Sequence, residues 1–189
     1  MKIKEIIKRL KEGNKRFISN TADRKLRDST RRDLLAAGQS PFAAILGCSD
    51  SRVVPEIIFD TGLGELFTVR VAGNIANTSS IASIEFSVAQ LNVRLVLVKG
   101  HSNCGAVTAA VEGGVYGNNL NRLFNHIAPA IEQTPGGNID EIIKKNAELN
   151  AEELLNGSTM IAAAVKSGQL KIITAFYHLE SGEVEFLTD

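Results

Sequence analysis

The chain has 189 residues, which is enough for one domain with a substantial hydrophobic core and short for two. Hydrophobic residues make up 44% of it and charged residues 22%, a composition typical of a folded protein and not of a disordered or fibrous one. Lysine plus arginine and aspartate plus glutamate are both 21, so no net charge favours nucleic acid or an anionic membrane as a partner. No apolar run approaches the roughly 20 residues that cross a bilayer, and the sequence opens with charged residues, so we expect a cytoplasmic protein.

The N-terminal segment is predicted to be helical. Apolar residues recur at the spacing of one helical face between residues 3 and 10, and Gly13-Asn14 is expected to loosen the end of this helix. Residues 19–30 are mostly polar and are typical of a surface loop. We therefore expect residues 1–30 to form an arm that packs away from the core of its own chain.

Four short apolar runs are typical of strands that are buried on both faces of a sheet. Helical patterns occur between them at residues 81–91 and 139–155, and this alternation indicates an α/β fold, a mostly parallel sheet covered by helices. A turn at residues 180–183 predicts a hairpin with an antiparallel edge strand at 184–187. No repeat suggests a boundary, so residues 1–189 are expected to form a single domain. The four predicted strands cover residues 42–47, 66–71, 95–98 and 170–176.

Both cysteines of the chain follow predicted strands: Cys48 ends one apolar run, and His101-Ser102-Asn103-Cys104 follows another. A reducing cytoplasm makes a disulfide the weaker explanation, which favours metal binding or thiolate chemistry. Open parallel sheets bind ligands beyond the carboxyl ends of their strands, where the strand order reverses. Zinc prefers thiolate and imidazole ligands, and a catalytic zinc keeps a fourth position for water or substrate. If the two strands are neighbours, Cys48, His101 and Cys104 form such a site.

The residues beside these three candidates also suit a metal site. Cys104 precedes a good helix start at Gly105, so its sulfur is expected to face the positive end of a helix dipole, which favours the thiolate. Asp50 and Arg52 share a loop with Cys48, and the guanidinium can hold the carboxylate by two hydrogen bonds. Held there, Asp50 can orient a zinc-bound hydroxide; released, it could bind the zinc and close the site. Taken singly, each residue also has an ordinary interpretation as a core cysteine, a loop ion pair or a helix cap.

These residues resemble the signature of the beta-class carbonic anhydrases, Cys-x-Asp-x-Arg followed by His-x-x-Cys. The resemblance implies one zinc ion per chain bound by Cys48, His101 and Cys104, with Asp50, paired to Arg52, as a fourth ligand or a gatekeeper. It extends over most of the chain through short matching segments. These are Asn14-Lys15-Arg16-Phe17, Gly38-Gln39-Ser40-Pro41, Pro55-Glu56, Gly64-Glu65-Leu66-Phe67, Arg70-Val71-Ala72-Gly73-Asn74, Ser83-Ile84-Glu85-Phe86 and Tyr177-His178-Leu179-Glu180-Ser181-Gly182.

The resemblance also implies a substrate pocket and an assembly. Gln39, Phe67, Phe86 and Gly105 match residues that contact substrate near the metal, and a tyrosine of the plant-type enzymes is replaced by Phe86. Family members pair as dimers that often assemble further, so we expect a homodimer or homotetramer with residues 1–30 lying across a partner subunit.

The implied activity is the reversible hydration of carbon dioxide to bicarbonate and a proton, through attack of zinc-bound hydroxide on CO2. Two alternatives stay open at this point. One is a hydrolase of carbon disulfide or carbonyl sulfide on the same scaffold, because the same hydroxide could attack those linear molecules. The other is a structural or regulatory zinc protein in which Asp50 permanently completes the tetrahedron. Neither a nucleic acid nor a membrane is expected as a partner.

Overall fold

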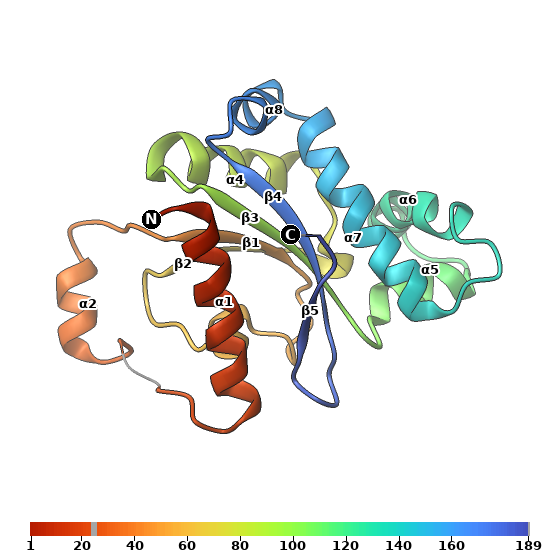
Figure 1. The fold of residues 1–189 in the computed structure, drawn as a ribbon. Helices are drawn as coiled ribbons and strands as arrows, with labels where there is room; N and C mark the ends of the chain where they lie inside the picture. The colour runs from red at the N-terminus through yellow and green to blue at the C-terminus, as the bar shows by residue number, and fades with distance from the viewer. Residues whose placement is uncertain (24–25, 189) are drawn as a thin grey trace.

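A five-stranded sheet forms the centre of the computed structural model, which describes residues 1–23 and 26–188 (Figure 1). The strand order is β2-β1-β3-β4-β5; the first four strands are parallel and β5 is antiparallel to β4. This confirms the predicted α/β fold with an antiparallel edge strand. The strands are β1 (Ala43–Gly47), β2 (Leu66–Arg70), β3 (Leu95–His101), β4 (Lys171–Tyr177) and β5 (Val184–Phe186).

Helices cover both faces of the sheet. On one face lie α1 (Ile3–Ile18) and the short α3 (Pro55–Ile58), and on the other lie α4 (Thr78–Leu91), α7 (Ile139–Asn156) and α8 (Thr159–Lys166). Helices α5 (Gly105–Glu112) and α6 (Asn118–Glu132) lie beside the carboxyl end of β3, and α2 (Ser29–Leu35) stands apart with no buried residue (Figure 1). Among the described residues, no helix combines the length and apolarity needed to span a bilayer.

Strands β1 and β3 are buried along their whole length, which explains their nearly continuous apolar sequence. Alternate side chains of each strand enter different cores. Ile45 and Leu97 belong to the core under α1 and α3, whereas Leu46 and Val98 belong to the core under α4, α7 and α8. Both layers of helices therefore hold the carboxyl ends of β1 and β3 in place.

Helix α1 packs on the core of its own chain, so the expectation that it packs away from that core is wrong. Leu10 is fully buried in the first core. The helix also does not loosen at Gly13-Asn14, because a Cβ atom at Gly13 would lie 1.9 Å from the carbonyl oxygen of Phe59, and only glycine permits this approach of two backbones. The side chain of Asn14 bonds three backbone groups elsewhere in the chain. Packing of residues 1–30 on a partner subunit stays a prediction.

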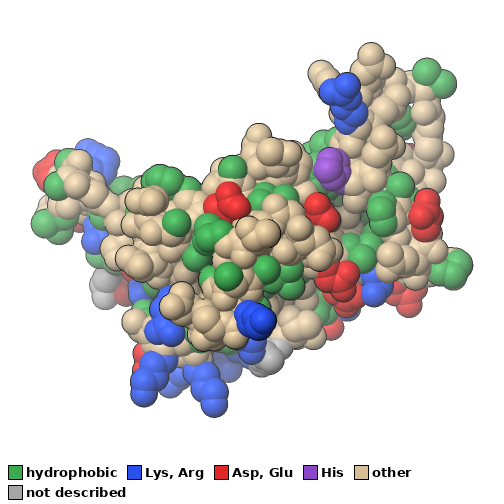
Figure 2. Space-filling model, turned by 90° about the horizontal axis from the view of Figure 1, so that it is seen from above, with side chains coloured by type: hydrophobic (Ala, Val, Ile, Leu, Met, Phe, Trp, Pro, Cys, Tyr) green, Lys and Arg blue, Asp and Glu red, His purple; other side chains and the backbone are tan. Residues whose placement is uncertain are grey.

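Charge is distributed unevenly along the chain, although the total balances. More than half of the 21 lysine and arginine residues lie in the first 32 positions. Figure 2 shows lysine and arginine side chains gathered along one margin of the molecule, with acidic side chains mostly elsewhere. Arg9 pairs with Glu65, and Arg16 Nε lies 2.6 Å from Asp60 Oδ2. Ion pairs of this kind help to attach the basic N-terminal segment to the body of the protein.

Candidate metal centre

The strands that carry the candidate ligands are neighbours, which was the condition for Cys48, His101 and Cys104 to form one site. β1 pairs with β3 in parallel, with Gly47 opposite Lys99. The chain passes from β1 to β2 on one side and then to β3 on the other, so the strand order reverses between β1 and β3. Cys48 follows β1, and His101 is the last residue of β3. Both side chains therefore lie at the position where open parallel sheets bind ligands.

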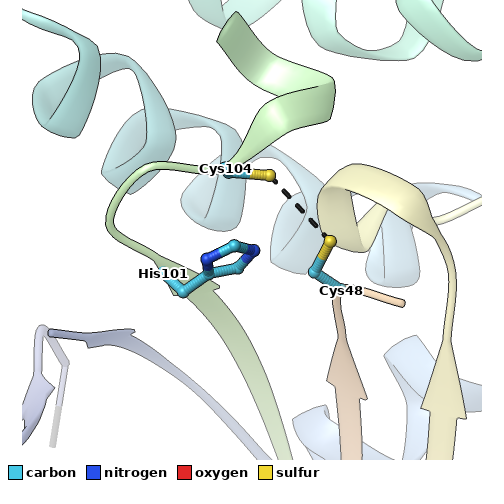
Figure 3. A group of neighbouring side chains, drawn as sticks. All are labelled: Cys48, His101 and Cys104. Carbon is cyan, nitrogen blue, oxygen red and sulfur yellow. Dashed lines mark hydrogen bonds between the residues drawn. The ribbon is translucent and has the colours of Figure 1, made fainter. Parts of the chain in front are cut away.

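Cys48, His101 and Cys104 converge on one point (Figure 3). Their ligand atoms all lie within 4.8 Å of one another, and all three residues are buried. The two sulfurs are 3.9 Å apart. Two Zn–S bonds of about 2.3 Å at a tetrahedral angle would separate the sulfurs by about 3.8 Å. The spacing of this pair thus fits a tetrahedral metal ion.

The imidazole of His101 is oriented for metal binding. Its Nδ1 lies 2.9 Å from the carbonyl oxygen of Ser102, which can only accept, so Nδ1 carries the proton and donates. The other nitrogen, Nε2, therefore carries the lone pair. Nε2 is buried and has no hydrogen-bond partner among the described residues. A buried acceptor without a partner is costly, and a metal ion would satisfy it while the Ser102 carbonyl fixes the ring.

The two thiols share a proton. The hydrogen bond with Cys104 lowers the pKa of Cys48 to about 4, with smaller contributions from the backbone N–H groups of Asp50 and Gly73, against the opposing effect of burial. The same sharing raises the pKa of Cys104, although two N–H groups at the start of α5 act in the opposite direction. The sequence analysis expected the start of α5 to favour a thiolate at Cys104, and these two N–H groups act on its pKa in that direction.

Asp50 is held by Arg52. Its carboxylate accepts hydrogen bonds from the backbone N–H of Arg52 at 2.9 Å, from Nε at 2.9 Å and from Nη2 at 2.7 Å. These bonds hold the pKa of Asp50 well below its usual range, so the group is ionised at any ordinary pH. Asp50 is outside the group of three converging ligands, and Arg52 also donates to the Asn103 carbonyl at 3.2 Å. Arg52 thus connects the two loops that carry the cysteines.

Comparison with known proteins agrees with this geometry. A family model described as carbonic anhydrase matches residues 43–184. Carbonic anhydrase 2 of Mycobacterium tuberculosis is 37% identical over 182 residues, covering 93% of this chain and 88% of the relative. A solved beta-carbonic anhydrase of Aspergillus fumigatus superimposes with a TM-score of 0.72 at 32% identity, covering 82% of this chain and 79% of that one. The chain belongs to the beta-carbonic anhydrase family.

Hydration of carbon dioxide is the general activity of these metalloenzymes. Two further solved beta-carbonic anhydrases have the same fold. The Coccomyxa enzyme, solved with acetazolamide, has a TM-score of 0.73 at 28% identity and covers 94% of this chain and 84% of its own. One of two tetrameric enzymes from Sordaria macrospora has a TM-score of 0.73 at 26% identity, with 84% and 86% covered.

In this beta-carbonic anhydrase, Arg70 also holds the loop that carries Cys48 and Asp50, a role that the sequence analysis missed. Arg70, at the end of β2, donates from Nε to the Cys48 carbonyl at 2.9 Å and from Nη2 to the Asp50 carbonyl at 2.5 Å. The position of Arg70 at the carboxyl end of a predicted strand was the available signal, and the resemblance included it without a role. Gly105 lies directly after Cys104 as the first residue of α5, beside the converging ligands.

Three predicted pocket residues do not lie beside the ligands within one chain. Gln39 is exposed and precedes β1, whereas Cys48 follows it; six extended steps between residues 42 and 48 span about 20 Å. Phe67 is opposite Ala44 in the register, near the start of β2. Its ring centroid is 6.2 Å from that of Phe86, which is 50% exposed on α4. These three residues can reach a metal centre only if it belongs to another copy of the chain.

Proposed function

We propose that this chain binds one zinc ion through Cys48, His101 and Cys104 and uses it for the reversible hydration of carbon dioxide to bicarbonate and a proton. The observation that carries the proposal is the convergence of two sulfurs, spaced as a tetrahedral metal ion requires, with an imidazole nitrogen that has no hydrogen-bond partner among the described residues. Three protein ligands are the number that leaves a catalytic zinc one position for water or substrate. When bound, zinc lowers the pKa of a water molecule from 15.7 towards about 7 and so supplies the nucleophile near neutral pH.

Asp50 is the residue of this chain that we expect to orient the nucleophilic water. Its ionised carboxylate can accept a hydrogen bond from a water molecule, and the bonds from Arg52 keep it ionised and fixed. With the water hydrogen directed to Asp50, a lone pair of the water oxygen is available to the carbon of CO2. If Arg52 is lost, the carboxylate becomes free to bind the metal itself and to exclude water. The proton leaves to solvent or buffer.

The ligand set also predicts how activity depends on pH. Two thiolates donate more negative charge to zinc than neutral imidazoles do, so they weaken the acidification of water. We therefore expect activity to rise on the alkaline side of neutral. This dependence belongs to the ligand set, because Asp50 is ionised throughout that range.

We further propose that the active form is a homodimer or homotetramer in which one subunit completes the pocket of another. The aromatic pair of Phe67 and Phe86 lies near the free edge of β2 with half of Phe86 exposed, and Gln39 is exposed at the other end of the sheet from the cysteines. An apolar wall of this kind suits CO2, which has no net charge or dipole. The tetrameric relatives from Sordaria macrospora support the higher assembly.

The test is direct assay of purified protein with three substrates: CO2 by stopped flow, and carbon disulfide and carbonyl sulfide by sulfide release. We expect rapid hydration of CO2, and loss of this activity in Cys48→Ser. Sulfide release with no CO2 hydration would instead identify a hydrolase of the sulfur compounds. Stoichiometric zinc with no activity toward any of the three would identify a closed, non-catalytic zinc site.

A further inference from the structure

One face of α7 carries two buried asparagines in the interior of the helix. Asn146 is fully buried and Asn150 is 4% exposed, and they are four residues apart, so they lie on the same side. Ile143 on this side packs against Gly100 of β3, the residue before His101. Burying two amide side chains costs free energy unless each makes hydrogen bonds. The partners of these two side chains therefore show what this face of α7 holds.

Both asparagines bond the segment that follows β2. Asn146 Nδ2 donates to the Gly73 carbonyl at 2.8 Å, and Asn150 Oδ1 accepts from the Ala76 N–H at 2.6 Å. Asn150 Nδ2 also donates to Asn146, to its carbonyl oxygen at 2.7 Å and to its Oδ1 at 3.0 Å. The second asparagine thus fixes the first. Together they hold residues 73–76 against α7 at two points.

The same segment touches the metal centre. The Gly73 N–H donates to Cys48 Sγ at 3.4 Å. Gly73 has φ 69° and ψ 17°, a left-handed conformation that favours glycine. The N–H that bonds the sulfur and the carbonyl that bonds Asn146 flank the same Cα atom, so the direction of one depends on the direction of the other. Asn146 therefore acts on the sulfur through a single residue.

We propose that Asn146 is a positioning residue for the metal centre: by holding the Gly73 carbonyl it directs the Gly73 N–H onto the Cys48 sulfur. This inference rests on the proposed function. An N–H donor withdraws electron density from a thiolate ligand and fixes its direction, so it adjusts how strongly the sulfur donates to a metal. Loss of the bond leaves Cys48 less well placed and more electron-donating. Outer partners of metal ligands have effects of about 10–100-fold on metal affinity or activity.

The test compares wild type with Asn146→Leu, which removes the amide but keeps the number and branching of the side-chain heavy atoms. Asn146→Ser, which is smaller and polar, serves if the leucine variant does not fold. The readouts are the dissociation constant for Zn²⁺, the thiolate-to-metal absorption band of the Co²⁺-loaded protein, and the pH midpoint of CO2 hydration. We expect metal affinity to fall about 10–100-fold. The absorption band should move to longer wavelength, and the pH midpoint should move upward.

Leu154→Ala is the matched control, because Leu154 is a fully buried residue of α7 in the core under α4, α7 and α8 and is not part of the metal centre. It destabilises the helix and is expected to leave the absorption band and the pH midpoint unchanged. If Asn146→Leu or Asn146→Ser folds and has the same band, affinity and pH midpoint as wild type, the inference is overturned. Equal changes in Leu154→Ala would overturn it too, since they would reflect stability alone. A wild type that binds no metal would refute the proposed function instead, before any variant is compared.

Discussion

Loading the metal-free protein with Zn²⁺ at pH 6 is expected to release close to one proton per chain, because water bound to the zinc keeps its own proton at that pH. Cys48 and Cys104 share a proton across 3.9 Å, which lowers the pKa of Cys48 to about 4 and raises that of Cys104. A metal ion needs both sulfurs as thiolates. Because the pair holds a single shared proton at pH 6, that proton is the one that leaves.

The same reasoning gives the sign and size of the pH dependence. Near pH 6 the metal-free pair holds one proton and the loaded pair holds none. The dissociation constant should therefore fall about tenfold for each unit rise in pH, or about 1.4 kcal/mol of binding free energy. Below a pH of about 4, Cys48 takes up a proton as well, so the dependence becomes steeper. Acid thus removes the metal, and alkali retains it.

Isothermal titration calorimetry in two buffers of different ionisation enthalpy measures the number of protons released. Cys104→Ser is the control, because a serine hydroxyl holds its proton and the variant should release almost none. Release of two protons by wild type would show that both thiols are protonated at pH 6. Release of none would show that both thiolates exist before the metal binds. Either result refutes proton sharing between the two sulfurs.

Three further predictions concern stability and the Asp50 clamp. Gly13→Ala should lower the free energy of unfolding by about 1–3 kcal/mol in a urea titration, because the new Cβ would lie 1.9 Å from the Phe59 oxygen. Gly38→Ala is the control: its Cβ would have no atom within 4 Å, so the free energy of unfolding should change by less than about 0.5 kcal/mol. Arg52→Gln should reduce CO2 hydration about 10–100-fold at constant zinc content, and full activity would disprove that Arg52 restrains Asp50. Zinc at 100 times its dissociation constant should add about 2.7 kcal/mol to the free energy of unfolding, measured with and without chelator.

The two segments that carry the candidate ligands could be predicted because the local sequence around each of them carried the information. The strands before Cys48 and His101 are buried on both faces, so they form apolar runs that stand out in the sequence. Parallel strands place their carboxyl ends together, and both cysteines fall there. The pairing of Asp50 with Arg52 is likewise a contact between residues two apart, which depends little on the rest of the fold.

The features that sequence analysis missed depend on contacts between distant segments. Gly13 reads as a helix breaker, but its role is to let α1 approach Phe59. Asn146 is a polar residue in a helical pattern, and only the fold shows that it bonds Gly73, 73 positions earlier. Gln39 matches a family motif, yet one chain places it far from Cys48. Helices α2, α6 and α8 were not predicted, and they interact mainly with other helices or with solvent.

The central claim is that one zinc ion at the cluster of Cys48, His101 and Cys104 makes this chain a catalyst of CO2 hydration. The measurement that tests it most directly is stopped-flow CO2 hydration by metal-free protein during titration with Zn²⁺. We expect negligible activity without metal, and a linear rise that ends at one zinc per chain. Full activity in thoroughly metal-depleted protein, or no activity at saturating zinc, would contradict the claim.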